Sequence, residues 1–292
     1  MALEGVVLDH VAVAVEAWAE AWPRYVVELG GQWASGGLNV GFGPAQLQYA
    51  NGARLEVLQP WQSEANPFLR RFLDSHGPGP HHLTFKVPDI ATALEAAGEA
   101  GFSPVSVDLS DPGWKEAFLH PRQAGGIVVQ LAQAAGSWEA PPPEGFPTER
   151  PASPASLVHV THAVASLDDA LHLYAGLLGG RVEHHDVPEA AGWEAVTVRW
   201  PGPLALRVIS PTAGRSELQE WLGGRPGRLH HLAFARAGAR TSSHRHHGDD
   251  ATPGVLPDDA PVRSVLEPDA NLGTRIVVVE PSSGSGAPGR AR

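Results

Sequence analysis

Residues 80–87, with the sequence PHHLTFKV, are the stretch that decides the fold. Apolar and polar residues alternate here, which predicts a β-strand with His82 on one face and His81 on the other, among apolar residues. The same pattern, a histidine that leads into an apolar alternation, recurs at 9–15 (DHVAVAV), 158–164 (VHVTHAV) and 230–234 (HHLAF). Four copies of one strand predict a chain built from four copies of one structural unit.

Each unit is predicted to have the order βαβββ. In the first unit, a strand over 6–15 is followed by a helix over about 17–29 and then by three short strands between 38 and 59. Pro23 is awkward within that helix, because proline lacks the N–H group that a helix interior needs. The fourth unit departs from the pattern after its first strand, since 239–254 (ARTSSHRHHGDDATPG) is a poor helix former.

The predicted fold class is therefore α+β, with tandem βαβββ units arranged as two domains of two units each. A stretch rich in proline and serine lies between the two pairs of units and is interpreted as a linker. The predicted boundaries are 1–133 for the first domain, 134–156 for the linker, 157–280 for the second domain and 281–292 for a disordered tail.

Composition limits the classes of function. The chain has 292 residues, a formal net charge of −11 and no cysteine, so disulfides, thiolate ligands and thiol nucleophiles are excluded. The negative charge disfavours nucleic acids and anionic membranes as partners. No apolar run is long enough to cross a bilayer, and the N-terminus lacks the basic region of a signal peptide. We expect a cytoplasmic protein that acts on a small molecule, as a monomer or a homodimer.

Four polar side chains of the first domain are predicted to share one face of the sheet. In each of their strands the neighbouring residues are apolar and face the other way, toward the helices. Two imidazoles, a carboxylate and an amide oxygen suit one divalent ion of Zn, Fe, Mn, Co or Ni, and suit calcium poorly. The predicted ligands are His10, Glu56, His82 and Gln130.

Four motifs carry a resemblance to a known family: LDHVAVAV (8–15), RLEVLQP (54–60), PHHLTFKVPDI (80–90) and EAFLHPRQAGGIVVQL (116–131). They resemble the vicinal oxygen chelate superfamily of glyoxalases, bleomycin-resistance proteins and dioxygenases, whose domains are paired βαβββ units. Within it, the first domain is most similar to the methylmalonyl-CoA epimerase family. The family's metal positions correspond to the four predicted ligands, with the Gln and Glu of epimerases exchanged between Glu56 and Gln130.

Two departures from the epimerase pattern concern the chemistry. The resemblance puts Asn39 where epimerases hold a catalytic glutamate, and Gln130 where they hold a metal-bound carboxylate. An amide cannot take a proton at neutral pH, so Glu56 is expected to be the catalytic base as well as a ligand. Asn39, Arg54, Trp114 and Lys115 are expected to bind the substrate.

The second domain is interpreted as a degenerate copy of the first. The positions of the four ligands are taken there by His159, Arg207, His231 and Val277. An arginine would put a cation beside the metal and a valine has no lone pair, so no metal is expected in this domain. His162, His244, His246 and His247 are interpreted as solvated or loop residues.

The sequence thus favours an enzyme: a divalent-metal-dependent lyase or isomerase of the glyoxalase or epimerase type, acting on a small carbonyl-containing or enolisable substrate. One alternative is a non-haem iron dioxygenase of the extradiol type, because two histidines and a carboxylate suit Fe(II). Another alternative is a non-catalytic protein that binds a small molecule and confers resistance to it. Metal content and turnover would separate these three hypotheses.

Overall fold

The first half of the chain forms one mixed β-sheet with four helical segments. The computed structural model describes residues 2–136, 140–188, 192–212, 216–236 and 261–281. The strands are β1 (Val7–Ala14), β2 (Gln32–Gly36), β3 (Gly41–Gln48), β4 (Arg54–Trp61), β5 (Gly79–Lys86), β6 (Val105–Asp111), β7 (Trp114–Leu119) and β8 (Val128–Ala134). The helical segments are α1 (Trp18–Trp22), the π-helix η1 (Pro23–Glu28), α2 (Phe68–His76) and α3 (Ile90–Glu99).

The second half repeats this arrangement. Its strands are β9 (Ser156–Val164), β10 (Arg181–Asp186), β11 (Trp193–Arg199), β12 (Ala205–Pro211), β13 (Gly227–Ala235), β14 (Val262–Leu266) and β15 (Ile276–Val279). Its helical segments are α4 (Leu167–Leu171), the π-helix η2 (His172–Leu177), α5 (Glu217–Leu222) and the 3-10 turn η3 (Pro268–Ala270). Residues 239–254 lie outside the described part of the chain, so the expected loss of the fourth helix stays a prediction.

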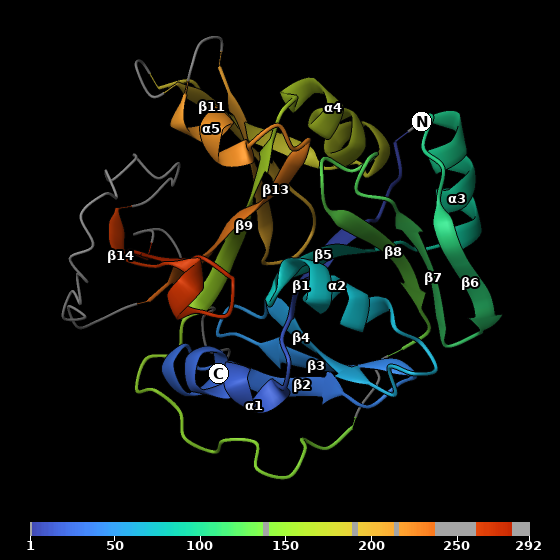
Figure 1. The fold of residues 1–292 in the computed structure, drawn as a ribbon. Helices are drawn as coiled ribbons and strands as arrows, with labels where there is room; N and C mark the ends of the chain where they lie inside the picture. The colour runs from blue at the N-terminus through green and yellow to red at the C-terminus, as the bar shows by residue number, and fades with distance from the viewer. Residues whose placement is uncertain (1, 137–139, 189–191, 213–215, 237–260, 282–292) are drawn as a thin grey trace, which may run out of the picture.

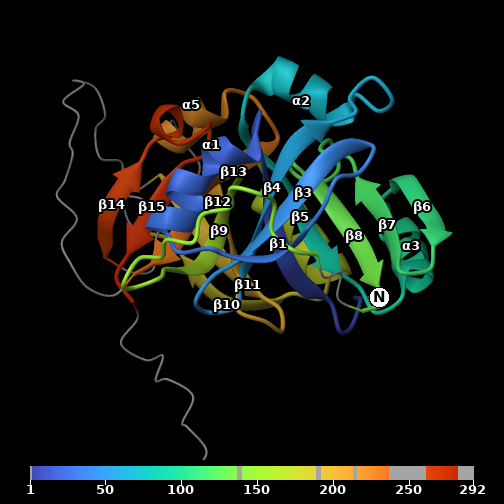
Figure 2. The same cartoon turned by 90° about the horizontal axis from the view of Figure 1, so that it is seen from below.

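The order of strands confirms the predicted fold class. The first sheet runs β2-β3-β4-β1-β5-β8-β7-β6 and the second β10-β11-β12-β9-β13-β15-β14. In each sheet the first strands of two units pair antiparallel at the centre, as β1 with β5 and β9 with β13. Each first strand pairs in parallel with the last strand of its own unit, which the βαβββ order requires. The outer strands β6 and β14 lie at opposite ends of the molecule (Figure 1, Figure 2).

The two sheets share one hydrophobic core. Phe85 of β5 packs against Tyr174 of η2 and Trp200 after β11, at ring-centroid distances of 6.0 and 4.9 Å. The backbones also meet closely: a Cβ atom on Gly126, which has φ +85°, would lie 1.9 Å from the carbonyl oxygen of Gly227. Only glycine fits this crossing, because any side chain would displace the opposite strand. The first half and the second half are therefore packed together.

Pro23 does not break its helix. It begins the π-helical turn η1, so its missing N–H group falls where α1 gives way to the wider helix. The second half has the same transition at η2, where His172 stands in place of a proline. The wider turn is therefore a feature of the repeated unit and does not depend on Pro23.

The stretch predicted as a linker packs against the first half. Phe146 contacts Trp22 and Trp33 at ring-centroid distances of 5.2 and 5.5 Å, and the indole N–H of Trp33 donates to the carbonyl of Ala140 at 2.7 Å. Figure 1 shows this segment running below α1 and β2. Phe146 thus holds this stretch through aromatic contacts that its proline and serine content did not indicate.

Helix α2 covers part of the face that bears the predicted ligands. Leu69 and Leu73 of α2 pack on Ala12, Ala14 and Leu58, three residues of β1 and β4. Helix α2 therefore fills one end of this face and leaves the ligand positions beside it. No helix among the described residues is long and apolar enough to span a membrane.

Candidate metal centre

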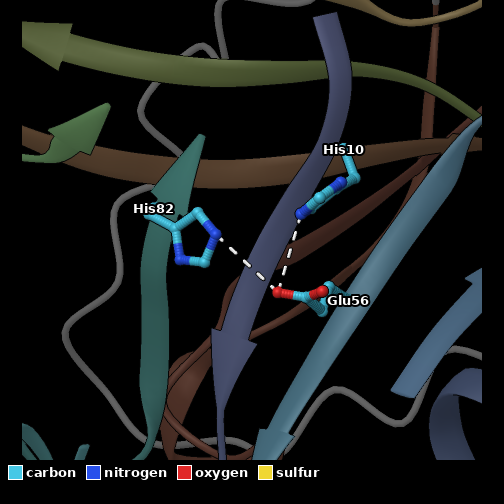
Figure 3. Close-up of side chains that lie close together, drawn as sticks. All are labelled: His10, Glu56 and His82. Atoms are coloured by element: carbon cyan, nitrogen blue, oxygen red, sulfur yellow. Dashed lines mark ion pairs between the residues drawn. The ribbon is translucent and has the colours of Figure 1, made fainter. Parts of the chain in front are cut away.

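Three of the predicted ligands converge on one point of the first sheet. His10, Glu56 and His82 come from β1, β4 and β5, which are adjacent strands (Figure 3). The Nε2 atoms of His10 and His82 lie 3.6 and 3.7 Å from the Oε2 atom of Glu56. Ala12 pairs with both Glu56 and His82, and its methyl group leaves the space between them open.

The three residues fit a metal ion. Nε2 of His10 and Nε2 of His82 are buried and have no hydrogen-bond partner among the described residues, although a buried polar atom normally has one. The three ligand atoms all lie within 4.8 Å of one another. Bonds of about 2.0–2.2 Å from a central ion to each atom would need only a slight contraction of this group. The set suits Zn, Fe, Mn, Co or Ni alike.

Two β-bulges in the pairing of β1 with β5 orient the side chains of His10 and His82. The pairing shifts between Leu8 and His10, which leaves Asp9 as an extra residue on β1. The Oδ2 atom of Asp9 lies 2.8 Å from Nδ1 of His10, and Asp9 also forms an ion pair with Lys86 at 3.0 Å. Because Asp9 engages Nδ1, the Nε2 atom of His10 faces Glu56.

The second bulge corrects the predicted orientation of His81. The pairing shifts between Ala12 and Val13, so His81 is the extra residue on β5 and strict alternation fails there. Its ring packs against Phe72 of α2 at 4.6 Å, on the same side as His82, and the Nδ1 atoms of the two histidines lie 2.8 Å apart. The prediction that His81 lies on the opposite face of the strand from His82 is wrong. His81 instead supports His82 as Asp9 supports His10.

The protonation states of the metal-free site differ between the two histidines. Burial disfavours a charge on His10, but the carboxylates of Glu56 and Asp9 outweigh it and raise the pKa of His10 to about 9. Burial, followed by repulsion from His81 and His10, lowers the pKa of His82 well below its usual value. In the metal-free site His10 is thus protonated beside Glu56, whereas His82 is neutral, as a metal ligand must be. Metal binding requires His10 to release its extra proton.

Gln130 lies beside this group on β8. Its Oε1 atom accepts a hydrogen bond from the hydroxyl of Thr84 at 2.5 Å, and its Nε2 atom donates to Glu116 at 2.6 Å. A carbonyl oxygen has a second lone pair, so Oε1 is able to bind a metal as well. The sequence interpretation did not include Glu116, although its strand alternation with Trp114 would have placed both on the face of Gln130.

Asn39 lies outside the strands that bear the predicted ligands. It is exposed in the turn before β3, where its backbone exchanges hydrogen bonds with Phe42 at 2.8 and 3.2 Å. The residue opposite Glu56 is Gln46 of β3, whose Nε2 atom donates to Oε1 of Glu56 at 3.4 Å. The sequence analysis did not identify Gln46, because the register of a hairpin depends on its loop. Gln46 is again an amide and not a base.

The other residues expected to bind the substrate do not all lie on the same face of the sheet. Arg54 pairs with His10 across β4 and β1 and so lies on the face of the ligands; it makes no side-chain hydrogen bond or ion pair within the described part of the chain. Trp114 donates from its indole nitrogen to Glu116 at 2.7 Å. Lys115 lies opposite Gln133, whose side chain caps the start of α3, so Lys115 points away from the site.

The second sheet keeps the two histidines but changes their surroundings. The rings of His159 and His231 are 5.9 Å apart, against 5.8 Å for His10 and His82. Arg207 takes the position of Glu56 and binds Asp186 at 3.0 Å. Thr161 replaces Ala12, and its hydroxyl lies 3.0 Å from Nε2 of His231. Within the described ranges, His10, Glu56 and His82 are the group of His and carboxylate ligands close enough to hold a metal.

The prediction that His162 is solvated is wrong. His162 is fully buried between the sheets, where its Nε2 donates to the carbonyl of Gly125 at 2.7 Å and its Nδ1 accepts from Tyr174 at 3.0 Å. Because Nδ1 accepts a hydrogen bond, the ring must be neutral, and burial lowers the pKa of His162 to about 4. His244, His246 and His247 lie outside the described residues.

We expect the burial of His162 to make folding dependent on pH. The unfolded pKa is near 6.5 and the folded pKa about 4, so the full contribution is present above pH 6.5 and is lost as the pH falls toward 4. The loss should reach about 3 kcal/mol. Urea unfolding at pH 7 and pH 4.5 should show a smaller difference in His162→Gln than in the wild type. His172→Gln, at an exposed histidine, is the control; equal pH dependence in all three proteins would contradict the assignment.

The protein thus consists of paired βαβββ units and contains a group of side chains of the kinds that bind metal ions. A family model described as a glyoxalase-like domain matches residues 8–178, and the chain therefore belongs to the glyoxalase-like domain family. This confirms the family predicted from the sequence. The uncharacterized protein YqjC of Bacillus subtilis (strain 168) is 28% identical over 142 residues, which cover 44% of this chain and 93% of that protein.

Two solved structures illustrate the likeness. A mutant 4-hydroxymandelate synthase from Streptomyces coelicolor covers 78% of this chain and 70% of its own, with 18% identity and a TM-score of 0.57, and it shares the fold of both halves. A methylmalonyl-CoA epimerase from Mycobacterium tuberculosis is 26% identical, covers 44% of this chain and 89% of its own, and has a TM-score of 0.40.

Proposed function

We propose that this protein is a divalent-metal-dependent lyase or isomerase that acts on a small carbonyl-containing or enolisable substrate. The observation that carries the proposal is the pair of buried Nε2 atoms of His10 and His82, which lack a hydrogen-bond partner among the described residues and face Glu56. Groups of this kind are costly to bury unless a ligand satisfies them. A metal ion bound by two neutral imidazoles and one carboxylate would do so.

Each residue of the site is assigned a separate chemical role. When bound, the metal supplies a Lewis acid that stabilises negative charge on a substrate oxygen. Glu56 is the carboxylate that faces the two histidines, and we assign it the transfer of the proton. Gln46, which donates to Glu56, and Gln130, which lies on β8 beyond β5, are amides, which orient groups but take no proton. This arrangement favours proton transfer by one base over a mechanism with two bases on opposite sides of the substrate.

Arg54 is proposed to bind a negatively charged group of the substrate. It lies two residues before Glu56 on the same face of β4, a distance of roughly 7 Å along the strand. Its half-buried guanidinium makes no ion pair with Glu56 or with any other described residue. A carboxylate or phosphate of a substrate whose carbonyl oxygen lies at the metal position would come within reach of Arg54.

We expect Arg54→Gln to raise KM for an anionic substrate by about 10- to 100-fold, the usual value of a charge-assisted hydrogen bond. KM for a neutral analogue, such as the methyl ester, should stay the same, and so should metal content. Arg71→Gln, which removes an exposed charge from α2, is the matched control. Equal KM values for Arg54→Gln and wild type with the anionic substrate would show that Arg54 has another role.

The proposed function is tested by metal content and by hydrogen exchange. Protein purified without chelators or a polyhistidine tag should contain one divalent ion per chain, measured by elemental analysis. Candidate substrates with an acidic C–H group should exchange this hydrogen in deuterated solvent only when the metal is present, as measured by NMR. Protein that binds no metal after incubation with each of the five ions would contradict the proposal and favour a binding function.

A second candidate function is a non-haem iron dioxygenase. The observation that favours it is the ligand set itself, because His10, His82 and Glu56 are two histidines and one carboxylate. The two enzymes differ in their co-substrate: a dioxygenase consumes O₂ and requires Fe(II), whereas a lyase or isomerase does neither. An oxygen electrode with the Fe(II)-loaded protein separates them for each substrate that is tried.

A further inference from the structure

We propose that Glu116 is a positioning residue that fixes the orientation of the Gln130 side-chain amide, so that its oxygen and not its nitrogen is offered to the metal. This inference rests on the proposed metal function of the site. Glu116 lies on β7, next to β8, and its Oε2 atom accepts a hydrogen bond from Nε2 of Gln130 at 2.6 Å. On its other side the amide oxygen accepts from Thr84 at 2.5 Å.

Glutamine at a ligand position presents a difficulty that a carboxylate does not. The two ends of an amide have almost the same shape, but only Oε1 has lone pairs for a metal, while the NH₂ group would point two hydrogens at it. Rotation of the Gln130 amide by about 180° would therefore turn a ligand into a group that repels the ion. Some neighbour has to distinguish the two orientations.

Glu116 makes this distinction and Thr84 does not. A hydroxyl donates or accepts, so Thr84 is able to pair with either end of the Gln130 amide. An ionised carboxylate only accepts, so Glu116 pairs with the NH₂ group and is repelled by the carbonyl oxygen. The observed hydrogen bonds follow this rule, since the amide nitrogen faces Glu116 and the amide oxygen faces Thr84.

Glu116 is itself held in place as an acceptor. The indole N–H of Trp114 donates to the same Oε2 atom at 2.7 Å, and an indole nitrogen donates only. Trp114 and Glu116 stand two residues apart on β7, on the face that also bears Gln130. The carboxylate also attracts the amide hydrogen, which shifts electron density toward the amide oxygen of Gln130 and makes this oxygen a better donor to a metal.

The test compares Glu116→Gln in two backgrounds. In the otherwise wild-type chain, residue 116 would then pair with either end of Gln130, and affinity for Zn²⁺ should fall by about 10- to 100-fold. In the Gln130→Glu background residue 130 has two equivalent oxygens, so orientation no longer matters, and Glu116 only repels the new carboxylate. There, Glu116→Gln should leave Zn²⁺ affinity unchanged or raise it. Affinity is measured by competition with a chromophoric chelator, and the visible spectrum of the Co²⁺ form reports the ligand set.

Two further variants keep the outcome clear. Asp108→Asn removes a negative charge from the residue opposite Glu116 on β6 and should leave Zn²⁺ affinity unchanged. Trp114→Phe removes the donor that holds Glu116 and should weaken Zn²⁺ binding, by a smaller factor, only where residue 130 is glutamine. Equal loss of affinity from Glu116→Gln in both backgrounds, or no loss in either, would overturn the positioning role. Failure of the wild type to bind any metal would overturn the proposed function and this inference together.

Discussion

Glu56→Gln is expected to reduce turnover by about 10²–10⁴-fold while the protein keeps part of its metal. The substitution retains the shape of the side chain and an oxygen donor but removes both the negative charge and the basicity. Loss of a positioned general base usually costs a factor of this size. Exchange of the substrate's acidic hydrogen with deuterated solvent should decrease in parallel, because the same carboxylate carries the proton in both measurements.

The same variant has a second readout in the metal-free protein. Glu56 is the largest of the influences that raise the pKa of His10 to about 9. In Glu56→Gln that pKa should fall, which NMR titration of the imidazole would detect without any substrate. Glu95→Gln, on the exposed side of α3, is a control that should change neither turnover nor the titration of His10. Full turnover with full metal in Glu56→Gln would mean that the proton travels through another group.

His82→Ala is expected to abolish stoichiometric metal binding at little cost to folding. The imidazole lies on the face of the ligands, and its Nε2 atom has no partner among the described residues, so its removal costs only the hydrogen bond between the Nδ1 atoms of His81 and His82. The free energy of unfolding of the metal-free protein should fall by roughly 1 kcal/mol, as for an average substitution. The measurements are metal stoichiometry after equilibrium dialysis, and thermal unfolding of the metal-free forms.

The repeated architecture provides a matched control for this variant. His231 holds the same place on β13 as His82 on β5, at nearly the same distance from its partner histidine. There Thr161 engages the imidazole and Arg207 replaces the carboxylate, so His231→Ala should leave metal stoichiometry unchanged. Loss of metal in His231→Ala and its retention in His82→Ala would place the metal in the second sheet and contradict the assignment.

Local alternation was enough to predict much of this protein from its sequence. The strands that begin near His10, His82, His159 and His231 all occur, and the residues at ligand positions share one face, because side chains alternate along the regular parts of a strand. The four copies of this strand pattern predicted the four-unit organisation. The family also followed from short motifs, since these preserve the spacing of the strands and turns.

Long-range pairing was decided only by the tertiary structure. Gln46 lies opposite Glu56 because the register of β3 on β4 depends on the hairpin between them. Asp9 and His81 contact the ligand histidines because they lie at β-bulges. A β-bulge arises from the pairing of two strands and is not recognisable from the sequence of either strand alone. His162 was buried because the loop of the first half that contains Gly125 packs against it, and Glu116 reached Gln130 because β7 pairs with β8. The sequence by itself thus determined which side chains are able to bind a metal. Pairing between distant segments decided which groups hold them in place, since those contacts join residues that no local pattern connects.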